Sequence, residues 1–174
     1  MSRLPLDEAR LRAARIALVL TDNDGTLTDG RVYYSDRGEE LKAYSLRDGM
    51  GVERLRQAGV QTAIITRETS RLVRRRAEKL SLPYLFTGVA DKRSHLPLVL
   101  DATGLRLDQV AYLGDDVNDL GVMEVIAPAG LIAAPGDAMR SVTDVVHFVT
   151  ESQGGHGAFR EFAEWLLSLR GADA

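Results

Sequence analysis

Residues 16–26 read IALVLTDNDGT, an apolar run that ends in an acidic turn. The run Ile16–Leu20 has the length and the unbroken apolar character of a strand covered by helices on both faces. Asp22 and Asp24 follow it directly. In open α/β sheets the residues just beyond the carboxyl ends of strands form the binding site, so this stretch predicts two carboxylates at a functional sheet edge. The alternative is a purely local turn, which Asp and Gly also favour.

The same pairing of an apolar run with a polar end recurs along the chain. Runs of strand length alternate with segments of helical periodicity, which is typical of βαβ units around a parallel sheet. Further strands are expected at Thr62–Ile65, Tyr84–Phe86 and Val110–Leu113, and helices around Ser70–Leu80, Lys92–Ala102 and Asn118–Val125. The predicted fold class is therefore α/β, a Rossmann-like three-layer sandwich with a parallel sheet.

Residues 31–44 interrupt this alternation. They contain two strand-like runs around the turn Ser35–Gly38, and they predict a β-hairpin inserted between the first strand and a helix that starts near Asp48. A hairpin that projects from the main sheet leaves apolar side chains such as Tyr33 and Leu41 to be covered. Pairing of subunits around the hairpin would cover them, so the sequence predicts a homo-oligomer.

The two ends of the chain carry no strand pattern. Residues 1–15 mix acidic and basic side chains without an apolar segment, so they predict a surface helix or arm and no signal peptide. Residues 150–174 form a tail in which a glycine-rich linker precedes an amphipathic helix over Gly157–Leu169. The linker is expected to be mobile, and the functions of His156 and Arg160 stay open.

Length and composition restrict the class of protein. The chain has 174 residues, 45% of them hydrophobic, which predicts a single domain over residues 1–174 with a substantial core. The 22 basic and 25 acidic residues give a net charge of −3, which does not favour nucleic-acid binding. No apolar run has the roughly 18 residues of a membrane span. The lack of cysteine excludes disulfides and thiolate metal sites. We therefore expect a cytoplasmic protein that binds neither nucleic acid nor membrane.

A second acidic cluster follows the expected strand Val110–Leu113. It contains Asp115, Asp116 and Asp119. Because the carboxyl ends of parallel strands meet at one edge of a sheet, these side chains and Asp22 would bring several negative charges together. Such clustering is costly without a cation, and an all-oxygen ligand set favours a hard cation such as Mg²⁺.

Two further polar residues sit at element boundaries of the same pattern. Thr66 follows the run Thr62–Ile65, and Lys92 starts an expected helix. A hydroxyl and a positive point charge both suit phosphoryl oxygens. Each alone has an ordinary explanation, a helix cap for Thr66 and a solvated surface for Lys92. The ordered set of Asp-x-Asp-Gly, Thr, Lys and Gly-Asp-Asp-x-x-Asp is far more specific.

This ordered set resembles the four motifs of the haloacid dehalogenase superfamily of aspartate-nucleophile phosphatases, and the resemblance covers almost the whole chain. Within it, the chain looks like the small capless branch that contains 3-deoxy-manno-octulosonate 8-phosphate phosphatase and the nonulosonate 9-phosphate phosphatases. The residues that carry this closer resemblance are Leu27–Gly30, Ser45–Gly49, Arg74–Lys79 and Gly154–Glu161. The resemblance implies a homotetramer that acts on a 2-keto sugar acid phosphate.

The resemblance also implies a mechanism. Asp22 would attack phosphorus to form an aspartyl-phosphate, and Asp24 would act as general acid and base. A Mg²⁺ ion would be held by the side chains of Asp22 and Asp115 and by the backbone carbonyl of Asp24. Thr66 and Lys92 would contact the phosphoryl oxygens. Asp116 and Asp119 would orient the ligands of the metal ion.

Substrate contacts are assigned by the same resemblance, some of them across a subunit boundary. The residues are Ser45, Leu46, Arg47, Asp48, Gly49, Glu68, Arg76 and Lys79. The alternative for the first group is structural, since Arg47 and Asp48 can cap a helix that begins at Gly49. The alternative for Arg76 and Lys79 is a solvated basic helix face.

Glu68 departs from the octulosonate branch, in which an arginine is usual at this position. A glutamate would repel the carboxylate of a sugar acid and would prefer its hydroxyls or an amine. The combination of Glu68 and Lys79 resembles the nonulosonate 9-phosphate phosphatases. A nonulosonate 9-phosphate is therefore the expected substrate, and the octulosonate 8-phosphate is the alternative.

Other functional classes fit the sequence less well. A phosphate-binding-loop enzyme is disfavoured because no Gly-x-x-x-x-Gly-Lys-Ser/Thr motif occurs. A receiver-like signalling module also combines an acidic cluster, a hydroxyl and a lysine. Such a module needs no acid for a sugar leaving group, so Asp24 favours the phosphatase. A catalytically idle subunit is disfavoured because every position of the motif set is filled.

Overall fold

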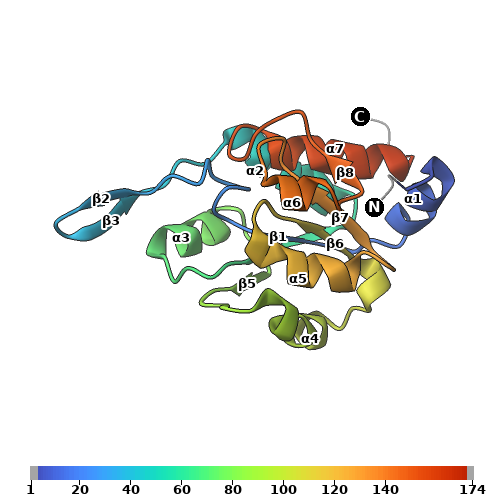
Figure 1. Cartoon of the computed structure of the whole chain (residues 1–174), viewed down its shortest axis with the longest axis horizontal. Coiled ribbons are helices and arrows are strands. Elements are labelled where there is room, and N and C mark those ends of the chain that lie inside the picture. The colour runs from blue at the N-terminus through green and yellow to red at the C-terminus, as the bar shows by residue number, and fades with distance from the viewer. Residues whose placement is uncertain (1–3, 172–174) are drawn as a thin grey trace.

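A six-stranded parallel sheet forms the centre of the molecule, and it confirms the predicted α/β fold. The computed structural model describes residues 4–171. The strand order is β5-β4-β1-β6-β7-β8 (Figure 1). The strands are β1 Leu18–Thr21, β4 Gln61–Ile65, β5 Tyr84–Phe86, β6 Val110–Leu113, β7 Leu131–Ala134 and β8 Phe148–Val149. Strands β1, β6 and β7 are buried along their whole length, as expected for strands covered on both faces.

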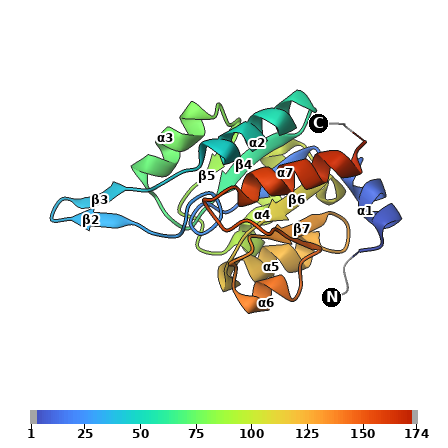
Figure 2. The ribbon, with the colours of Figure 1, turned by 90° about the horizontal axis from the view of Figure 1, so that it is seen from above.

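Helices cover both faces of the sheet and complete three layers (Figures 1 and 2). One face is covered by α1 Leu6–Ala13, α2 Leu46–Gln57, α3 Arg71–Lys79 and α7 Ala158–Leu169. The other is covered by α4 Lys92–Thr103, α5 Val117–Ile126 and the short α6 Arg140–Thr143. A 3-10 turn at Leu107–Gln109 precedes β6. Successive residues of β1 point to opposite faces, so Val19 enters one apolar cluster and Leu18 and Leu20 the other.

The structure corrects several element boundaries. Strand β1 begins at Leu18, two residues later than the apolar run, and β7, β8 and α6 lie where the sequence analysis expected no element. Helix α2 begins at Leu46, and its N-cap is Ser45, whose hydroxyl accepts hydrogen bonds from the backbone nitrogens of Arg47 and Asp48 at 3.1 and 3.4 Å. The structural alternative, in which Arg47 and Asp48 cap a helix that begins at Gly49, is therefore wrong.

The predicted hairpin is present and projects from the body of the molecule (Figures 1 and 2). Its strands are shorter than expected, β2 at Tyr33–Ser35 and β3 at Gly38–Leu41, and they pair in antiparallel fashion. Tyr33 and Leu41 face each other across the hairpin and are 55% and 63% exposed. The apolar side chains that we expected to be covered are thus exposed in the single chain.

The glycine-rich segment before α7 packs against the loop after β1, so the expectation of a mobile linker is wrong. The backbone nitrogen of Gly155 donates to the carbonyl of Thr26 at 3.0 Å. A Cβ atom on Gly154 would lie 1.8 Å from the carbonyl oxygen of Gly25, so only glycine allows this approach. Asp48 adds a second tie, because its Oδ1 accepts from the backbone nitrogen of Arg160 at 2.9 Å. The C-terminal segment therefore buttresses the first acidic loop.

Parts of the expected terminal segments, residues 1–3 and 172–174, lie outside the described residues, and a single domain over 1–174 stays a prediction. Within residues 4–171, no helix has the length and apolar character needed to span a bilayer.

Candidate active site

The sheet topology brings the ends of three strands together. After β1 the chain continues to β4 and β5 on one side and later to β6, β7 and β8 on the other, so β1 lies where the strand order changes direction. Thr21, the last residue of β1, is level with Ile64 on β4 and Leu113 on β6. Ligands bind at such a point in open α/β sheets. Asp22, Thr66 and Asp115 emerge at this edge, just beyond these strands.

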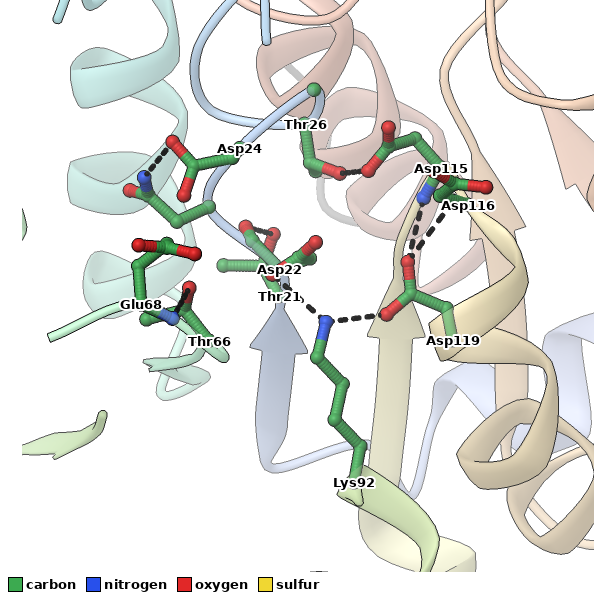
Figure 3. A network of polar contacts seen from close by, with 12 residues as sticks. Thr21, Asp22, Asp24, Thr26, Thr66, Glu68, Lys92, Asp115, Asp116 and Asp119 are labelled. Carbon is green, nitrogen blue, oxygen red and sulfur yellow. Dashed lines mark hydrogen bonds and ion pairs between the residues drawn. The ribbon is translucent and has the colours of Figure 1, made fainter. Parts of the chain in front are cut away.

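Lys92 joins the acidic loop after β1 to helix α5. Its ammonium lies 2.8 Å from Asp22 Oδ1 and 2.6 Å from Asp119 Oδ1, and its side chain is only 1% exposed (Figure 3). Asp91 caps α4 by accepting from the backbone nitrogens of the second and third helical residues, which fixes Lys92 at the first position of the helix. The interpretation of Lys92 as a solvated surface lysine is therefore excluded.

Asp119 is completely buried, and its carboxylate is saturated by donors. Besides Lys92, the Tyr112 hydroxyl donates to Oδ1 at 2.5 Å. The backbone nitrogens of Asp115 and Asp116 donate to Oδ2 at 2.9 and 3.2 Å (Figure 3). Asp119 thus holds the second acidic loop in shape. Asp116 itself is exposed and caps α5.

Asp115 is positioned by the first acidic loop. The Thr26 hydroxyl donates to its Oδ1 at 3.1 Å. Gly25, at a φ of +89°, lets the two loops meet, since a Cβ there would lie 2.0 Å from Asp115 Oδ2. The two acidic loops are consequently in direct contact.

The electrostatics of this cluster fit a cation. Ligand atoms of Asp22, Asp115 and Asp119 all lie within 4.8 Å of one another. Burial and the charge of Asp119 raise the pKa of Asp22 to about 7, although Lys92 opposes the shift. Burial and the charges of Asp22 and Asp119 raise the pKa of Asp115 to about 8. A hard divalent cation would restore both anionic forms, and the oxygen donors present suit Mg²⁺.

A cavity of about 310 Å³ opens over this cluster. Its lining residues are Asp22, Asp24, Gly25, Gly30, Thr66, Arg67, Glu68, Asp115, Asp116 and Asn118. Most of the predicted catalytic and metal-binding residues therefore line one cavity. Lys92 and Asp119 do not line it, but Lys92 contacts Asp22 and Asp119 contacts Lys92. Thr66 is buried at the cavity, and its hydroxyl accepts from the backbone nitrogen of Glu68 at 3.2 Å.

The predicted substrate residues divide into two groups. Glu68 lines the cavity, whereas Ser45–Gly49, Arg76 and Lys79 do not. The guanidinium of Arg76 donates to the carbonyl of Ser45 at 2.8 Å and lies 5.1 Å from the centre of the Tyr44 ring. Arg76 therefore ties α3 to the start of α2 within one chain.

Three residues near the cavity were missed by the sequence analysis. Asn23 is completely buried, and its side chain donates to Asp24 Oδ1 at 3.0 Å and accepts from the Tyr44 hydroxyl at 3.2 Å. Lys42, just after β3, forms an ion pair with the same Asp24 oxygen. No local pattern distinguishes Lys42 or Tyr44 from other hairpin residues, because only the fold brings them to Asp24.

Two curated relatives match most of this chain. A 3-deoxy-D-manno-octulosonate 8-phosphate phosphatase KdsC of Yersinia pestis is 38% identical over 161 residues, which cover 92% of this chain and 84% of the relative. The KdsC of Haemophilus influenzae is 36% identical over 90% of this chain and 85% of its own length. No family model matches the chain.

The chain belongs to the KdsC-like phosphatases of the haloacid dehalogenase superfamily.

Solved structures of this family agree with the architecture. A crystal structure of the Yersinia pestis phosphatase has a TM-score of 0.88 and 37% identity, and covers 95% of this chain and 88% of that one. A phosphatase from Moraxella catarrhalis, solved with a magnesium ion, a phosphate ion and KDO, has a TM-score of 0.87 and 33% identity, with 96% and 94% of the two chains covered. The cobalt-bound Haemophilus influenzae phosphatase has a TM-score of 0.86 and 35% identity, with 92% of each chain covered.

Proposed function

We propose that this chain is a Mg²⁺-dependent phosphatase that hydrolyses the phosphomonoester of a 2-keto sugar acid through an aspartyl-phosphate on Asp22. The observation that carries the proposal is the position of Asp22, which lies at the cavity between Lys92 and the carboxylate of Asp115. Asp24 lines the same cavity two residues further on. A nucleophile, an acid and a cation site therefore face one space.

The metal would be held by the side chains of Asp22 and Asp115 and by the backbone carbonyl of Asp24. When bound, Mg²⁺ neutralises the repulsion between an anionic nucleophile and an anionic phosphate. Asp119 and Asp116 are assigned the role of orienting this shell, because Asp119 is saturated by four donors and Asp116 caps a helix.

The first step forms a bond between a carboxylate oxygen of Asp22 and phosphorus. The bond from phosphorus to the sugar oxygen breaks, its electron pair stays on that oxygen, and Asp24 supplies the proton. In the second step water attacks phosphorus and gives its proton to Asp24, and the bond to Asp22 breaks to release inorganic phosphate. Thr66 and Lys92 bind the oxygens of the transferring group in both steps.

The substrate proposed for this site is 3-deoxy-manno-octulosonate 8-phosphate. The named relatives are phosphatases of this compound, and the Moraxella catarrhalis structure contains KDO with phosphate and magnesium. The expectation of a nonulosonate 9-phosphate from Glu68 and Lys79 receives no support from them. Glu68 nevertheless lines the cavity, so the nine-carbon substrate is kept as the second candidate.

A panel of phosphate-release assays tests this function. With Mg²⁺, kcat/KM is expected to be highest for the octulosonate 8-phosphate and lower for neuraminate-type 9-phosphates.

Asp22→Asn removes the nucleophile and abolishes release. Asp24→Asn removes the acid and lowers kcat by about 10²–10⁴-fold. Asp101→Asn, an exposed change on α4, is the matched control and leaves the rate unchanged. Turnover by Asp22→Asn, or a higher kcat/KM for a 9-phosphate, contradicts the proposal.

Glu68→Arg tests the role of the glutamate in substrate choice. An arginine at the cavity can pair with a sugar-acid carboxylate, whereas Glu68 repels it. The ratio of kcat/KM for the octulosonate 8-phosphate over the 9-phosphate is expected to rise about 10-fold, which is the equivalent of about 1.4 kcal/mol. An unchanged ratio shows that Glu68 does not determine substrate choice.

Self-association through the hairpin is the second part of the proposal, and a homotetramer is the expected state. Its support is the exposed cross-strand pair Tyr33 and Leu41 on the projecting hairpin. Sedimentation velocity is expected to show a tetramer, which Leu41→Glu dissociates. Leu98→Glu, at a 59% exposed leucine of α4, is the control and leaves it intact. A monomeric wild-type protein refutes this part.

A further inference from the structure

The two carboxylate oxygens of Asp24 have different surroundings. Oδ1 accepts a hydrogen bond from the Asn23 side chain and forms the ion pair with Lys42. Oδ2 is buried and has no hydrogen-bond partner among residues 4–171. Asp24 lines the cavity, and Oδ2 is its oxygen that no residue of this range occupies, so Oδ2 is the one free to exchange a proton once substrate or water binds beside it.

Two carboxylates, those of Asp24 and Glu39, hold the ammonium of Lys42. Its side chain is 1% exposed, and its ammonium also lies 3.4 Å from Glu39 Oε1. The other oxygen of Glu39 accepts a hydrogen bond from the hydroxyl of Ser70, the N-cap of α3. Glu39 thereby connects the base of the hairpin to the start of α3, and Lys42 connects it to the loop after β1.

We propose that Lys42 is a positioning residue for the reaction: it holds Asp24 through Oδ1, so that Oδ2 faces the leaving oxygen of the substrate. The proposal rests on the proposed role of Asp24 as the general acid. The hairpin would then have a second role besides the proposed self-association. Through the ion pair between Lys42 and Asp24, the position of the Asp24 carboxylate would depend on the base of the hairpin.

The physical reason is the freedom of a carboxylate on a loop. An aspartate side chain rotates among several rotamers, and proton transfer requires one orientation at hydrogen-bond distance. A buried ammonium held by Glu39 offers Asp24 one fixed partner, while the amide of Asn23 supplies a second donor to the same oxygen. Both contacts therefore favour the same orientation of the carboxylate.

Leaving-group dependence tests the proposal. For each variant, kcat/KM is measured on the octulosonate 8-phosphate, whose alkoxide needs a proton, and on 4-nitrophenyl phosphate, whose phenolate leaves without one. Because kcat/KM covers the steps up to departure of the leaving group, a displaced acid lowers the first value more than the second. Lys42→Met is expected to lower the ratio of the two values at least 10-fold, and Lys42→Arg to restore part of it.

Companion variants separate the possible failures. Asp24→Asn must lower the same ratio further; an unchanged ratio there rejects the acid role of Asp24 and with it the proposed function. If Asp24→Asn lowers the ratio but Lys42→Met does not, the Lys42 proposal alone is rejected. Equal losses on both substrates in Lys42→Met show a merely structural role and also reject it.

The hairpin itself supplies a matched pair of variants. Glu39→Gln loses the charge that holds Lys42, and it is expected to lower the ratio in the same direction as Lys42→Met but by less. Glu40→Gln, on the next residue, leaves the ratio unchanged, because Glu40 is exposed and its carboxylate accepts a hydrogen bond from Ser35 of β2. If Glu40→Gln lowers the ratio as much as Glu39→Gln does, the proposed role of Glu39 in holding Lys42 is contradicted.

Discussion

Two buried carboxylates, Asp22 and Asp119, and the partly buried Asp115 repel one another at the carboxyl edge of the sheet, and the position of Lys92 between the two buried ones keeps this arrangement folded. Lys92 contacts Asp22 and Asp119, and its burial is almost complete. Loss of one partner from a buried ion pair typically costs about 3–5 kcal/mol, because the remaining charge has no compensation. The residues proposed to carry the chemistry therefore also fix the ends of β1 and β6 and the start of α4.

Repulsion that remains within the cluster is what makes it a candidate cation site. The pKa of Asp22 rises to about 7 and that of Asp115 to about 8, chiefly through burial and then through neighbouring carboxylates. Lys92 is engaged by Asp22 and Asp119, and Asp115 has the Thr26 hydroxyl as its side-chain donor. A divalent cation held by Asp22 and Asp115 would complete the charge balance of this edge and would prepare Asp22 for its proposed role as nucleophile.

The sequence predicted the parts of the site that lie next to strands. Asp22, Thr66 and Asp115 follow apolar runs, and parallel strands bring such positions together by topology alone. Lys42 and Asn23 could not be predicted, because their contacts depend on where the hairpin returns to the sheet. The substrate role expected of Arg76 stays a prediction, and within the chain its guanidinium donates to the carbonyl of Ser45. This contact could not be predicted, because helical spacing shows which residues share a face but not what that face packs against.

Covalent catalysis by Asp22 is the central claim, and trapping of the intermediate tests it most directly. The enzyme with Mg²⁺ and the octulosonate 8-phosphate is quenched in acid before the first turnover ends, digested and analysed by mass spectrometry. The account predicts a phosphoryl group on the peptide that contains Asp22, and none in Asp22→Asn treated in the same way. Full substrate turnover with no phosphorylated peptide at any quench time, or with the group on another residue, would contradict it.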